Sequence, residues 1–172
     1  MIRAKLKFKK NKDGQIQNIA FFMVFIFSTI FLILVSKVIL NNFNDALDEG
    51  NIHTAESKQA TIDMDVAFPT FDNMILVVII LLSIGLIITS FLIPTHPIFL
   101  VINIIGIFFL CFLGMLLSNL YKDIIDNSED FASVYTTFPK LNFVMNKMPW
   151  IAAILVFVIT IIQYSKYRSD GG

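Results

Sequence analysis

The sequence predicts an all-α, polytopic membrane protein with four transmembrane helices. Four long apolar runs cover about residues 19–40, 74–93, 98–120 and 149–164. Three of them hold about 20 residues or more, enough at about 1.5 Å per residue to cross a hydrocarbon core of about 30 Å. The chain is 56% apolar and only 15% charged, with a mean hydropathy of +0.77. A soluble domain of this size could not cover so much apolar surface, so the runs are expected to face lipid.

Charge sets the expected orientation of these runs. Most acidic residues lie between the first and second runs and between the third and fourth, whereas the two ends of the chain are basic. Four crossings place both ends on one side of the membrane. The positive-inside rule counts Lys and Arg near the spans, so both termini are expected on the cytoplasmic side. The expected organisation is a basic cytoplasmic arm (1–18), a membrane domain (19–168) and a tail (169–172).

The arm is expected to contact anionic lipid headgroups or a partner protein. Near a membrane surface each basic residue adds about 1 kcal/mol of attraction. The stretch Lys5–Lys9 alternates basic and apolar residues, which would also suit a strand paired with a partner. The first run is too long for a cleavable signal and lacks a small-residue cleavage site, so it is expected to be an uncleaved anchor. The candidate contact residues of the arm are Arg3, Lys5, Lys7, Lys9, Lys10 and Lys12.

Between the first two runs the sequence predicts a surface loop over residues 41–66, with a short helix continuing the first run. Lys37 near the outer end of that run is expected to extend its ammonium group toward the interface. The segment 67–72 leads into the second run, and Pro69 is expected just before the helix begins.

The second and third runs are joined by only four residues, 94–97, which predicts a tight antiparallel hairpin. Small residues allow close approach of helices in a membrane, and Asn103 in the third run can form a hydrogen bond to a neighbouring helix. The second and third runs are therefore expected to pack directly against each other. The small residues on these predicted helix-packing faces are Gly85, Gly106, Gly114 and Ser118.

Two segments outside the four runs read as amphipathic. Residues 121–136 and 138–150 both place apolar side chains near one stripe, which suits helices lying in the membrane interface. Trp150 and Tyr164 flank the fourth run and suit the two membrane–water interfaces.

Nothing in the sequence carries a catalytic motif. The second, third and fourth runs hold no charged residue, and His53 and His96 are too far apart along the chain to suggest a metal site. Cys111 lies in the third run and is expected to be a buried structural thiol. We therefore expect no enzyme activity, no cofactor and no bound metal. The acidic loops would repel nucleic acid, so no direct contact with a genome is expected.

Short motifs along residues 71–168 carry a resemblance to a known class of proteins. They are Phe71-Asp72, His96-Pro97-Ile98-Phe99, Ser118-Asn119-Leu120-Tyr121, Phe138-Pro139 and Met148-Pro149-Trp150. In this order they resemble small multi-span membrane proteins encoded beside capsid genes in viruses with an internal membrane. The resemblance implies a structural protein that links the bilayer to an icosahedral capsid. Its implied partners are lipid, capsid or other membrane proteins, and copies of itself.

Two other functions fit the same sequence. The first is a non-catalytic accessory subunit of a cellular membrane complex, a class that is also short and poor in motifs. The second is a small channel or holin-like protein, with an oligomeric pore lined by Asn103 and serine residues. The expected location is the internal membrane of a virion or the inner membrane of the host cell.

Overall fold

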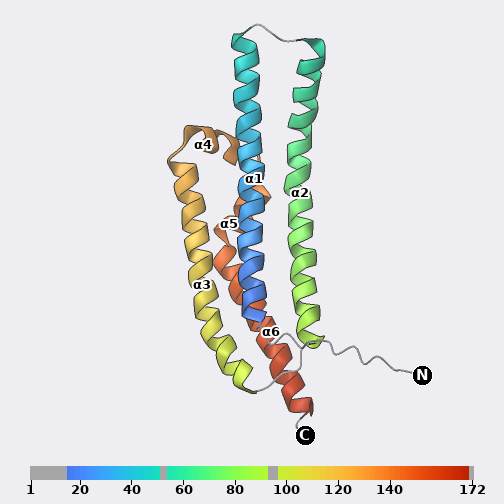
Figure 1. Ribbon diagram of the computed structural model, residues 1–172, viewed down its shortest axis with the longest axis vertical. Coiled ribbons are helices and arrows are strands. Elements are labelled where there is room, and N and C mark those ends of the chain that lie inside the picture. The colour runs from blue at the N-terminus through green and yellow to red at the C-terminus, as the bar shows by residue number, and fades with distance from the viewer. Residues whose placement is uncertain (1–14, 51–53, 93–96, 171–172) are drawn as a thin grey trace, which may run out of the picture.

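The computed structural model describes residues 15–50, 54–92 and 97–170, which are entirely helical apart from short connections. The six helices of these residues are α1 (Gln15–Glu49), α2 (Ala55–Leu92), α3 (Pro97–Asp126), α4 (Glu129–Tyr135), α5 (Pro139–Asn146) and α6 (Met148–Asp170) (Figure 1). Four of them, α1, α2, α3 and α6, are long and apolar enough to cross a membrane, as the sequence predicts.

The first two helices are much longer than a membrane requires. α1 has 35 residues and α2 has 38, which correspond to about 52 and 57 Å at 1.5 Å per residue, against a hydrocarbon core of about 30 Å. They run side by side in opposite directions and extend past the other long helices at one end of the molecule (Figure 1). We call this extension the stalk and define it as residues 36–50 and 54–68.

The stalk corrects the expectation of a surface loop over residues 41–66. Both helices continue through most of this stretch, and only 51–53 lie outside the described residues. The reason is that α1 and α2 pack against each other at the base of the stalk, where Leu40 and Phe68, on either side of this stretch, lie in the buried core, and both helices continue from there. Pro69 likewise lies inside α2 and not before its start.

The third helix packs against the last helix and not against the second. α3 makes its most extensive contacts with α6, and α2 also packs on α6, so α6 lies between them (Figure 1). Within the described residues the structure therefore does not show the expected direct packing of the second and third runs, although these two helices do run in opposite directions. Residues 93–96, in the predicted turn, are outside the described part of the chain.

The core is built around one face of α1. Buried residues recur along this helix every three or four positions, the spacing that places them on a single side. This face of α1 packs against α2, α3, α4 and α6, while the opposite side of α1 stays exposed. The core residues of α1 include Ile19, Met23, Ile26, Ile30 and Leu34, and those of α5 and α6 include Leu141, Met145, Met148, Ala152 and Ile159.

Candidate functional site

Several polar side chains that join different helices, among them the buried Lys37, Asp72 and Asn142, gather near the base of the stalk. We call this cluster the junction and define it by Lys37, Asp65, Asp72, Tyr121 and Asn142. It is the most distinctive polar feature of the described helices, because buried polar groups are costly unless each finds a partner.

Asp72 of α2 caps the N-terminus of α5. Its two carboxylate oxygens accept hydrogen bonds from the backbone N–H groups of Lys140, at 3.1 Å, and Leu141, at 2.8 Å. The first N–H groups of a helix have no partner within the helix. The N-cap residue of α5 is Phe138, whose side chain cannot accept a hydrogen bond. Asp72, only 4% exposed, therefore supplies from another helix both the acceptor and the negative charge that a helix N-terminus favours.

A second set of hydrogen bonds joins α3 to α5. The Tyr121 hydroxyl donates to the side-chain oxygen of Asn142, and the Asn142 amide donates to the backbone oxygen of Tyr135 at the end of α4. Tyr121 and Asn142 are 1% and 5% exposed. Both polar ends of the Asn142 amide are thus satisfied by different elements. This arrangement fixes α5 relative to α3 and α4.

Lys37 of α1 forms an ion pair with Asp65 of α2. Its ammonium group also lies 5.4 Å from the centre of the Phe68 ring, within the range of a cation–π contact. The Phe68 ring in turn meets the buried Phe138 ring edge-on at 5.9 Å. Lys37 is buried and does not extend freely to the interface as expected. The pair joins the two stalk helices at a defined register.

A basic residue also connects the helices at the other end of the molecule. The Lys166 side chain of α6 donates a 2.8 Å hydrogen bond to the backbone oxygen of Phe91, in the last turn of α2. A cation at a helix C-terminus is favourable because the last carbonyl groups are unsatisfied and carry partial negative charge. α2 is therefore held in its last turn by Lys166 and in its first half by Asp65 and Asp72.

The small residues predicted to pack helices have different environments. A Cβ atom at Gly114 of α3 would lie 2.9 Å from the Cα of Pro149 in α6 and 3.0 Å from the Cε of Met23 in α1. The absence of a side chain at Gly114 therefore allows both α6 and α1 to approach α3 closely. A Cβ at Gly85 would meet nothing within 4 Å. Gly85 therefore lies on an exposed side of α2, and the expectation that it packs against another helix stays a prediction. Gly106 and Ser118 are buried in α3.

Other expected site residues lie outside what the structure describes. The basic residues of the arm fall in residues 1–14, and the side chain of Asn103 is likewise not described, although its backbone belongs to α3. Cys111 is partly buried. Among the described residues no group of three or more His, Cys, Asp or Glu side chains is placed to hold a metal ion.

The sequence analysis missed the junction because its contacts join residues far apart in the chain. Lys37 and Asp65 are 28 residues apart, and Asp72 and Leu141 are 69 apart. One local signal was available. The pair Phe138-Pro139 starts a helix without a Ser, Thr, Asp or Asn cap, which indicates that another segment must supply the acceptor.

Comparisons with protein-family models, with curated proteins and with solved structures give no match. The function therefore has to be argued from the chain itself.

Proposed function

We propose that this chain is a non-catalytic structural protein of a membrane, and that it belongs to the internal membrane of an icosahedral virion, where it links bilayer and capsid. One observation carries the non-catalytic part. Each junction side chain makes a contact that joins two elements of the chain. These side chains therefore serve to hold the described helices together as a unit, which supports a structural role.

The proposed orientation follows from charge. Both termini lie on the cytoplasmic side, and the stalk, α4 and α5 lie on the opposite side, with α4 and α5 in the interface and the 93–96 connection on the side of the termini. A vesicle that pinches from the membrane into the cytoplasm keeps its cytoplasmic leaflet outside. The basic arm would then face capsid protein or headgroups, whereas the acidic stalk would face the interior.

The test is co-purification with particles. Virions and host membranes are separated on a density gradient, and the chain is quantified in both fractions by mass spectrometry. The proposal requires the chain in the particle fraction, and it must stay with the lipid when the shell is removed. Recovery only in the host membrane, together with a respiratory-type complex, would instead identify an accessory subunit.

A further inference from the structure

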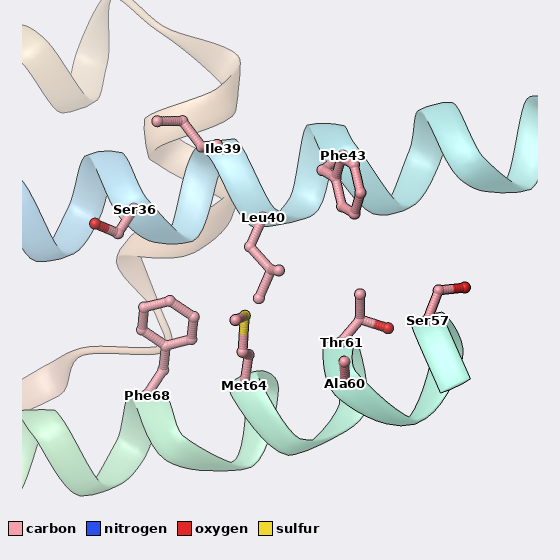
Figure 2. A pocket seen from close by; sticks show the side chains of 9 residues that line it. All are labelled: Ser36, Ile39, Leu40, Phe43, Ser57, Ala60, Thr61, Met64 and Phe68. Atoms are coloured by element: carbon pink, nitrogen blue, oxygen red, sulfur yellow. The ribbon is translucent and has the colours of Figure 1, made fainter. Parts of the chain in front are cut away.

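An open apolar groove runs along the stalk between α1 and α2. Its volume is about 530 Å³, and Figure 2 shows the side chains of both helices facing it. Ile39, Leu40 and Phe43 line it from α1, and Ala60 and Met64 line it from α2. Phe68, whose ring lies against the ammonium group of Lys37, also lines the groove, so the groove begins where the ion pair joins the two helices.

The hydroxyl groups of the groove are already engaged. Ser36 donates to the backbone oxygen of Leu32 at 2.8 Å, Thr61 to that of Lys58 at 2.9 Å, and Ser57 to that of Thr54 at 3.0 Å. These bonds are local, within the segment that carries each residue. The groove therefore offers an occupant mainly hydrocarbon surface, and apolar side chains would recognise it.

The groove lies beyond the hydrocarbon core of the membrane. The stretch of α2 beside it carries Glu56, Lys58, Asp63 and Asp65, and so many charged residues on one short segment are not tolerated among lipid tails. Even so, Phe43 is 54% exposed and Met64 is 56% exposed. A contiguous apolar patch outside the hydrocarbon marks an interaction surface.

Charge identifies the kind of occupant. Glu56 and Asp63 lie four residues before and three after Ala60, so they share its side of α2 and border the groove. The described stalk holds three further acidic residues on α1. Its basic residues are Lys37, which is paired with Asp65, and Lys58. A second copy would bring the same acidic residues and be repelled, and an uncharged lipid acyl chain would gain nothing from the negative charge of Glu56 and Asp63 beside the groove. The acids on α1 are Asp45, Asp48 and Glu49.

We propose that the groove binds an amphipathic helix of a partner protein, with an apolar stripe flanked by Lys or Arg. Its apolar residues would recur at i, i+3 or i+4, and i+7, as in other helix-in-groove complexes. Residues 57–68 of α2 span about 17 Å, or about three helical turns of the occupant. The bound helix would convert the two-helix stalk into a three-helix bundle. This contact lies across the membrane from the basic arm and is independent of the proposed capsid link.

The test uses the full chain in nanodiscs of zwitterionic phosphatidylcholine. The probe is a fluorescent helical peptide of Leu and Lys, about 18 residues long, with Leu on one stripe. Saturable binding is expected in fluorescence anisotropy. Ala60→Phe fills the groove and should weaken binding at least about tenfold, whereas Val66→Phe, at a 70% exposed position of the same helix, should change it less than about twofold. Glu56→Gln with Asp63→Asn should weaken binding and reduce its dependence on salt.

Several outcomes would overturn the proposal. They are absence of peptide binding, equal binding to Ala60→Phe, equal binding of a Leu/Glu control peptide, and equal binding to empty nanodiscs. Native mass spectrometry would reveal the other occupants. A retained phospholipid or a dimer that is lost in Ala60→Phe, without peptide binding, would assign the groove to lipid or to a second copy. Unchanged melting of Ala60→Phe and Val66→Phe verifies that both variants are folded.

Discussion

Removing the charge of Asp72 should loosen the attachment of α5 to the rest of the bundle. Asp72→Asn keeps one oxygen acceptor but loses the second acceptor and the negative charge. The N–H group of Lys140 or of Leu141 then loses its partner. A stranded buried N–H costs about 1–2 kcal/mol, and loss of a charge at a helix N-terminus costs about 1 kcal/mol. The expected loss is about 2–3 kcal/mol in total.

The single cysteine provides the assay. Cys111 is partly buried in α3, so its reaction with a thiol-reactive dye reports thermal unfolding in detergent. At about 2–4 °C per kcal/mol for a chain of this size, Asp72→Asn should lower the melting temperature by about 4–12 °C. Asp63→Asn is the matched control, because Asp63 lies on the same helix but is exposed and bonds only to Gln59 among the interactions described for it. Equal melting of the two variants would refute the capping argument.

Three further predictions follow from the described contacts and the arm. Asp65→Ala should destabilise the chain by about 2 kcal/mol more than Lys37→Met, because Asp65→Ala leaves a buried lysine without its ion-pair partner. The Lys37 side chain is 9% exposed and that of Asp65 is 53% exposed. Equal losses of stability in the two variants, measured by the dye assay, would contradict this. Gly114→Leu should lower the free energy of unfolding by about 3 kcal/mol or more, since the new side chain would clash with the backbone of Pro149. Gly85→Leu should leave stability unchanged or raise it slightly. A stable Gly114→Leu variant would show that α3 and α6 are not closely packed. Neutralising the arm should leave the melting temperature unchanged but weaken attachment of the chain to anionic vesicles or isolated shell and make that attachment less dependent on salt. Unchanged attachment would show that the helix bundle carries those contacts. The residues to change together are Lys5, Lys7, Lys9, Lys10 and Lys12.

The spans could be predicted from the sequence because hydrophobic length is a local property. Each of the four runs falls within one long helix, and no knowledge of tertiary contacts was needed to find it. The stalk was harder to predict. Residues 41–66 contain many Asn and Asp residues, which favour turns in isolation. The two helices nevertheless continue into this stretch from the packed base of the stalk, where the flanking residues Leu40 and Phe68 are buried.

The partners of each helix could not be predicted in the same way. Small residues on the third run indicate that some helix approaches closely, and Gly114 confirms a close approach, but the pattern does not say which helix it is. The structure places Pro149 of α6 there. Likewise, nothing near Lys37 in the sequence distinguishes an ammonium group that extends to the interface from one that pairs with Asp65 of another helix.

The most direct test of the account is the sidedness of the chain in a cell membrane. With Cys111 replaced by Ala, single cysteines are placed at Ser57 in the stalk, Ser128 before α4 and Ser169 near the C-terminus, and intact cells are treated with a membrane-impermeant thiol reagent. The account predicts labelling at Ser57 and Ser128 and protection at Ser169 until the cells are opened. Labelling at Ser169 with protection of the other two would contradict the orientation and place the acidic stalk in the cytoplasm.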